Sequence, residues 1–256
     1  MLDVAEWEEA EAPFEETAWS VVLAAGAETD ARAQAALAEL CRIYWRPIYA
    51  YLRRSGYATH DAQDLTQSFF QHVLENKTLR RASREKGRFR SFLLGTLKIC
   101  LADERARQHA LKRGGGVHFI SLDELIAEEL HFQPRTTDLS PAESLDARWA
   151  GVILERALEK VRAEFDAEGK SETFELLSPF LAGEKPNTSY QDVAQTIGLS
   201  LAAVKTQIHR LRRRFATAVR CEIMQTVAAP HEVENELRHL RDVFSRIAHA
   251  GQPIGP

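Results

Sequence analysis

Residues Tyr190–Phe215 read YQDVAQTIGLSLAAVKTQIHRLRRRF, which is a short helix-periodic segment, a glycine and a longer helix-periodic segment. Ala194 is small where two helices must approach each other, Gly198 permits a tight turn, and Ser200 can cap a second helix. This spacing is typical of a helix-turn-helix, whose second helix enters the major groove in many DNA-binding proteins. The side chains expected to form the core between its helices are Val193, Ile197 and Leu199.

The second helix of this motif has an apolar stripe on one side, formed by Val204, Ile208, Leu211 and Phe215. Lys205–Arg220 holds six Lys or Arg residues and no Asp or Glu, a composition that suits contact with phosphate. An ordinary helical hairpin with a solvated basic face fits the same pattern. The candidates for base or phosphate contact lie opposite the apolar stripe or at its edge: Lys205, Thr206, His209, Arg210 and Arg213.

The other periodic segments also have helical spacing and none alternates like a strand, so we expect an all-α fold. A run of three glycines at 114–116, followed by an acidic stretch with two prolines, indicates a linker that contains one short helix after Ser121. The expected divisions are an acidic N-terminal extension (1–17), a first helical domain (18–113), a linker (114–147), a helix-turn-helix domain (148–222) and a C-terminal helical extension (223–256). Helices are expected around Leu37–Ile48, Leu65–Val73 and Phe89–Cys100, and over Trp149–Phe165, Thr173–Leu181, Tyr190–Ile197, Leu201–Ile223 and Asn235–Ala248.

Charge is segregated along the chain, although the net charge is only −4. Residues 1–30 carry nine acidic and no basic side chains, whereas residues 31–113 carry 17 basic side chains against seven acidic ones. One basic region in 80–113 and a second in the helix-turn-helix predict two separate contacts with a polyanion. The acidic N-terminus and the C-terminal helix are candidates for an autoinhibitory cover over these regions.

Several classes of protein fit the sequence poorly. Three scattered cysteines, Cys41, Cys100 and Cys221, argue against a disulfide framework or a cysteine zinc site, so we expect reduced and mostly buried thiols. The histidines show no metal-ligand spacing and the glycines form no phosphate-binding loop, so we expect no enzyme activity, no catalytic residues, no cofactor and no metal. The chain has neither an apolar run near the ~20 residues of a membrane span nor a secretory signal, so we expect a cytoplasmic protein with no membrane contact.

Two segments of the first helical domain carry further patterns. In the helix around Leu65–Val73, the residues expected inside are Ala62, Leu65, Phe69 and Val73, and those expected outside are Asp61, Asp64, Gln67, Gln71 and Glu75. Taken alone, this acidic and amide-rich stripe fits a solvated helix face. The second segment, GRFRSFL at 87–93, opens a helix with an aromatic inner stripe and a basic outer face, which suits phosphate contact.

The order of these segments resembles that of bacterial RNA polymerase sigma factors of the extracytoplasmic-function type. The shared pattern is D-A-x-D-L-x-Q at Asp61–Gln67, F-R-S-F-L at Phe89–Leu93, a linker and then the helix-turn-helix, and it spans roughly residues 18–222. The resemblance implies that 18–113 is sigma domain two, which binds polymerase and the −10 element, and that 148–222 is sigma domain four, which binds the −35 element.

The same resemblance implies roles for individual residues. Asp61, Asp64, Gln67 and Gln71 would bind the polymerase, and the helix-turn-helix candidates would read the −35 element. The residues that would approach the −10 element and its melted strand are Arg88, Arg90, Lys98, Arg105 and Arg107. The implied partners are core RNA polymerase, promoter DNA and an anti-sigma factor or other regulator.

The expected function is therefore that of a sigma factor, which directs core RNA polymerase to promoters, assists melting and performs no chemistry itself. The alternative is a helix-turn-helix regulator that acts without polymerase. That alternative leaves the Asp64/Gln67 face and the Phe89 helix without a role. Dependence on polymerase distinguishes the two.

Overall fold

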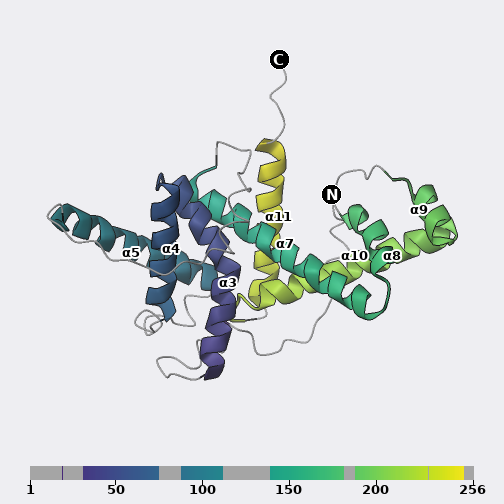
Figure 1. Ribbon diagram of the computed structural model, residues 1–256, viewed down its shortest axis with the longest axis horizontal. Helices are drawn as coiled ribbons and strands as arrows, with labels where there is room; N and C mark the ends of the chain where they lie inside the picture. The colour runs from purple at the N-terminus through teal and green to yellow at the C-terminus, as the bar shows by residue number, and fades with distance from the viewer. Residues whose placement is uncertain are drawn as a thin grey trace, which may run out of the picture. The chain divides into compact units, whose positions relative to one another are not determined.

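The protein is all-α, as the sequence predicts (Figure 1). The computed structural model describes Trp19 and residues 31–74, 88–111, 139–181, 188–229 and 231–250, and all regular elements within these ranges are helices. They are α3 (Ala31–Arg54), α4 (Thr59–Leu74), α5 (Phe89–Leu111), α7 (Pro141–Ala167), α8 (Ser171–Leu177), the 3-10 helix η3 (Ser178–Leu181), α9 (Tyr190–Ile197), α10 (Leu201–Met224) and α11 (His231–Ala250). None of these helices has the length and apolar character of a membrane span. The short helix expected after Ser121 lies outside the described residues.

The described residues divide into two compact units, which we name by their helices. The α8–α10 unit comprises residues 153–224, and the α3–α11 unit comprises residues 16–152 together with 225–256. Helix α7 contributes its first part to the α3–α11 unit and its second part to the α8–α10 unit. The C-terminal segment, which the sequence analysis set apart as an extension, thus groups with helices far from it in sequence.

The core of the α3–α11 unit is built around an aromatic cluster. Trp19 packs on Phe89 with ring centroids 4.9 Å apart, and Tyr44 of α3 meets the same ring edge-on at 5.3 Å. The backbone N–H of Phe89 donates to the carbonyl of Thr226 at 3.1 Å, and that of Trp19 donates to Gln225 at 3.2 Å. These bonds hold the segment before α11 inside the core, where Thr226 is buried.

Helix α4 packs against α3. The buried side of α4 is rotated by part of a turn from the side that the sequence predicts. Ala62, Phe69 and Val73 are buried as predicted, but Leu65 is only half-buried. Thr66 and Phe70 are buried in addition. The Thr66 hydroxyl donates to the carbonyl of Ala62 at 2.6 Å, so it satisfies its proton within the helix and can lie in an apolar contact.

The α8–α10 unit is closed by a turn between α7 and α8. Gly169 adopts a left-handed conformation with φ of 67°, and Lys170 N–H donates to the carbonyl of Phe165 at 2.8 Å. This turn brings Phe165 against Phe174 of α8, with ring centroids 5.6 Å apart. Both rings are buried, together with the apolar stripe of α10.

The three cysteines are free thiols, but each is half-buried rather than fully buried. The expectation of mostly buried thiols is therefore wrong in degree. Burial nevertheless raises the pKa of the Cys41 thiol to about 12, which keeps this side chain protonated at neutral pH.

Candidate nucleic-acid interface

The first helix of the helix-turn-helix, α9, begins with a capping box that fixes its start. The Ser189 hydroxyl accepts a hydrogen bond from the backbone N–H of Asp192 at 3.2 Å, and the Asp192 carboxylate accepts from the backbone N–H of Ser189 at 3.0 Å. The side-chain and backbone hydrogen bonds from Ser189 hold the pKa of Asp192 below its ordinary value. The S-x-x-D pattern at 189–192 is the sequence signal for this cap, and our sequence analysis did not use it.

The turn between the two helices has the predicted geometry. Gly198 is left-handed with φ of 72°, and the backbone N–H groups of Gly198 and Leu199 both donate to the carbonyl of Ala194. The Ser200 hydroxyl accepts from the backbone N–H of Ala203 at 3.2 Å, so Ser200 caps α10 as predicted. These local bonds define the angle at which α10 leaves α9.

The prediction that Leu199 belongs to the core of this motif is wrong. Leu199 is 40 % exposed, and Ile197 is half-buried, whereas Val193 is fully buried. Leu199 lies between the left-handed Gly198 and the cap residue Ser200, where the chain bends outward before α10 begins. Its side chain therefore stands on the outside of the turn.

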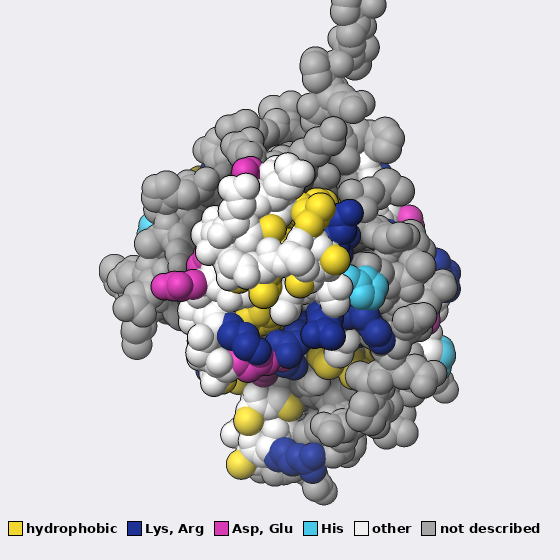
Figure 2. Space-filling view, turned by 90° about the vertical axis from the view of Figure 1, so that its right-hand side faces the viewer, with side chains coloured by type: hydrophobic (Ala, Val, Ile, Leu, Met, Phe, Trp, Pro, Cys, Tyr) yellow, Lys and Arg dark blue, Asp and Glu magenta, His cyan; other side chains and the backbone are white. Residues whose placement is uncertain are grey.

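Helix α10 has the two faces that the sequence predicts. Val204, Ile208, Leu211 and Phe215 are buried. The candidate contact residues on the other side are all exposed: Lys205, Thr206, His209, Arg210 and Arg213. Figure 2, which faces the side of Figure 1 where α9 is labelled, shows a row of Lys and Arg side chains beside exposed hydrophobic ones.

Two basic residues of the same run are engaged in the α8–α10 unit itself. Arg212 donates to the carbonyl of Phe180 at 3.2 Å. Arg214 forms an ion pair with Glu168 at 2.9 Å, and its guanidinium lies 5.1 Å from the centre of the Phe165 ring. Hydrogen bonds from Lys170 and Arg214 hold the pKa of Glu168 below its ordinary value. These two arginines fasten α10 to η3 and to the end of α7.

The candidate polymerase contacts lie along one side of α4. Asp61 and Gln71 are exposed, and Asp64 and Gln67 are half-buried. The carboxylate of Asp64 lies 3.1 Å from Nδ1 of His60, one turn earlier. The fifth residue of the expected stripe, Glu75, lies outside the described residues.

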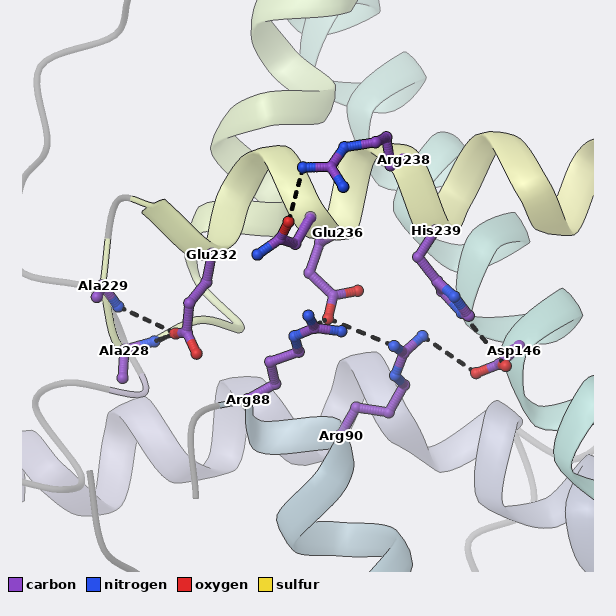
Figure 3. Close-up of polar contacts among 10 residues, drawn as sticks. Arg88, Arg90, Asp146, Ala228, Ala229, Glu232, Glu236, Arg238 and His239 are labelled. Atoms are coloured by element: carbon purple, nitrogen blue, oxygen red, sulfur yellow. Dashed lines mark hydrogen bonds and ion pairs between the residues drawn. The ribbon is translucent and has the colours of Figure 1, made fainter. Parts of the chain in front are cut away.

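The candidates at α5 do not form one surface. Lys98 is exposed on the helix, whereas Arg88 and Arg90 at its start face carboxylates of other helices (Figure 3). Arg105 and Arg107 lie in the last part of α5, and their side chains are outside the described set. The structure thus places two of the five predicted −10 contacts in an internal ion cluster.

This ion cluster joins α5, α7 and α11. Oε1 of Glu236 accepts ion pairs from Arg88 at 3.0 Å and from Arg90 at 3.4 Å, and the Glu236 side chain is only 2 % exposed. Arg90 also reaches Asp146 at 3.1 Å, and its guanidinium lies 4.9 Å from the centre of the Trp149 ring. Nε2 of His239 lies 3.2 Å from the same Asp146 carboxylate.

The sequence analysis missed the acidic half of this cluster. Glu236 lies within the apolar spacing of α11, beside Leu237 and three residues after Val233, both of which are buried. A carboxylate at such a position is a sequence signal for an internal partner, since burying an unpaired charge is costly. The second oxygen of Glu236, Oε2, has no hydrogen-bond partner among the described residues.

Comparison of the chain with protein-family models, with curated proteins and with solved structures finds no match. Among the described residues, no three His, Cys, Asp or Glu side chains gather in an arrangement that could hold a metal ion. The candidate functional surface of the described chain is the exposed basic face of α10, which suits a polyanion with a grooved surface.

Proposed function

We propose that this protein is a sigma factor that directs core RNA polymerase to promoters and performs no chemistry of its own. The observation that carries the proposal is the helix-turn-helix: a capped α9, a left-handed turn at Gly198, and an α10 whose acid-free outer face is exposed. In DNA-binding proteins such a second helix enters the major groove, where basic side chains neutralise phosphate.

The α4 face supports the polymerase part of the proposal. Asp61, Asp64, Gln67 and Gln71 share one side of α4 with exposed or half-exposed side chains, so an acidic and amide-rich surface is available to a basic partner. These are the positions at which the resemblance to sigma factors implies contact with polymerase.

Reconstituted transcription tests the proposal. The full chain is added to core RNA polymerase with a library of promoter fragments, and initiation is compared for the wild type, an Asp64→Ala/Gln67→Ala variant and an Arg210→Ala/Arg213→Ala variant. We expect initiation from a defined subset of fragments and its loss in both variants. The matched control is Lys160→Ala/Arg241→Ala, which removes two exposed basic side chains from α7 and α11. Initiation no different from core polymerase alone would refute the proposal.

A helix-turn-helix regulator that acts without polymerase is the second candidate, and the ion cluster favours it. Arg88 and Arg90, which the sigma reading assigns to the −10 element, are paired with Glu236 and Asp146. Under this alternative, the α3–α11 unit has a structural or regulatory role and only α10 contacts DNA. Sequence-specific gel shifts by the protein alone, unchanged by the Asp64/Gln67 substitutions, would establish it.

A further inference from the structure

The outward face of α10 changes character along its length. Its first part exposes Leu201, Ala202, Lys205 and Thr206, of which Ala202 and Thr206 are small and carry methyl groups. The exposed residues further along are polar or cationic: His209, Arg210, Arg213 and Arg214. Ala202 and Thr206 are four positions apart, so the two side chains are neighbours on the helix surface.

Two exposed apolar side chains flank the start of α10. Of the four large hydrophobic side chains exposed in the described chain, Leu199 and Leu201 lie there, whereas Tyr190 begins α9 and stacks on Phe180. Leu201 begins α10 and is 38 % exposed, and Leu199 stands on the outside of the turn. The start of α10 is thus bordered by apolar surface, beside the row of basic side chains seen in Figure 2.

The hydroxyl of Thr206 is committed within the helix. Its Oγ1 donates to the carbonyl of Ala202 at 3.0 Å, which uses the only proton that the side chain can donate. Thr206 therefore has its γ-methyl group and a lone pair to offer a partner, and no hydrogen-bond donor. Ala202 offers a methyl group alone.

We propose that Ala202 and Thr206 recognise the 5-methyl groups of thymine in the major groove, while Arg210 and Arg213 hold phosphates. The first residues of a recognition helix are those that meet base edges, and thymine is the only base that presents a methyl group there. Leu199 and Leu201 exclude water from the sides of this contact. The inference rests on the proposed function, because it requires that α10 bind duplex DNA.

Replacing thymine by deoxyuridine tests the inference, because deoxyuridine keeps the pairing and the O4 acceptor but lacks the methyl group. A binding sequence is first selected from a random duplex library with the full chain and core RNA polymerase, with core polymerase alone as background. Each thymine is then replaced in turn. Burial of one methyl group predicts a loss of about fourfold in affinity at one or two positions.

Two matched variants assign the effect to Thr206. Thr206→Val keeps the methyl group and removes the hydroxyl, so binding to thymine DNA and sensitivity to deoxyuridine are expected to persist. Thr206→Ser keeps the hydroxyl and removes the methyl group, so the variant is expected to bind the two DNAs alike at one position. Arg213→Gln is the control: it weakens binding to both DNAs equally and lowers the salt slope by about one unit.

The outcomes separate this inference from the proposed function. Selection of a sequence that contains no thymine, or of one in which deoxyuridine changes nothing, overturns the methyl contact and leaves DNA recognition by α10 intact. Equal sensitivity of Thr206→Ser and wild type assigns any methyl effect to residues other than Thr206 and overturns its role. If no sequence is selected above the polymerase background, both the inference and the proposed function fail.

Discussion

Glu236 of α11 lies 3.4 Å from Arg90 at the start of α5, although 146 residues separate them in the chain. The same carboxylate oxygen pairs with Arg88 at 3.0 Å, so one buried acidic side chain holds two arginines. This contact makes α11 part of the α3–α11 unit, and it changes what is expected from substitutions in the C-terminal segment.

Replacing Glu236 should strongly destabilise the protein. Glu236→Gln keeps the shape but leaves two arginines facing a neutral, almost completely buried amide, and breaking a buried ion pair from one side costs about 3 kcal/mol. The exposed Asp242→Asn change on the same helix is the control, expected to cost less than about 0.5 kcal/mol. Urea unfolding followed by circular dichroism measures both, and equal midpoints for the two variants would contradict this role of Glu236.

Removing residues after 229 should unfold the α3–α11 unit. The deletion takes away four buried aliphatic side chains, Val233, Leu237, Leu240 and Val243, which together contribute about 6–12 kcal/mol by burial. This is comparable with the whole stability of a typical domain. If the C-terminal helix were only an autoinhibitory cover over the basic regions, the truncated protein would stay folded and would bind promoter DNA better. A cooperative thermal transition of the truncated chain at the same melting temperature as the full chain would favour the autoinhibitory role.

Alanine substitutions of two glycines, one in the left-handed turn and one in helix α5, are expected to change stability in opposite directions. Gly198→Ala forces a Cβ into a conformation with φ of 72° and should cost about 1–2 kcal/mol. Gly95→Ala places a Cβ within helix α5, where no described atom beyond the adjacent residues and the helix's own backbone lies within 4 Å of it, and should stabilise by about 0.5–1 kcal/mol. Thermal denaturation of the two variants checks the sign of each change. A stabilising Gly198→Ala would rule out the left-handed turn.

The capping box predicts that the stability of the α8–α10 unit falls at acidic pH. Because Ser189 lowers the pKa of Asp192 in the folded state, the carboxylate stabilises the fold above its unfolded pKa, and this contribution disappears as the pH falls through the lowered folded value. Ser189→Ala should return the pKa of Asp192 toward its ordinary value. NMR titration of the Asp192 carboxyl carbon measures it in both proteins. An unchanged titration in the variant would show that the box does not form.

The helix-turn-helix was predictable because its determinants are local. Apolar spacing, Gly198 and the Ser200 cap all act within a few residues, and the structure confirms each of them. The outward bend of Leu199 depends on the exact backbone path and was not predictable from apolar character. The same holds for Arg212 and Arg214, whose partners lie in η3 and in the turn after α7.

The ion cluster was less accessible to sequence reasoning, because its members are distant in the chain. Val233, Leu237, Leu240 and Val243 recur with helical spacing and are buried, but this spacing does not say which helix they meet. Glu236 among them is a signal for a buried partner, which the sequence analysis did not use and which does not identify that partner. Only the folded chain brings Arg88 and Arg90 to that carboxylate.

The hydrogen bonds from Trp19 to Gln225 and from Phe89 to Thr226 have a consequence for the order in which the chain acquires structure during synthesis. The helices α3 to α5 leave the ribosome early, but their aromatic core is completed by residues 225–243, which follow more than a hundred residues later. The α8–α10 unit has all its helices available sooner. We therefore expect it to fold while the nascent α3–α5 helices still expose Phe89 and its neighbours, which makes this stage of translation the one at which chaperone binding matters most.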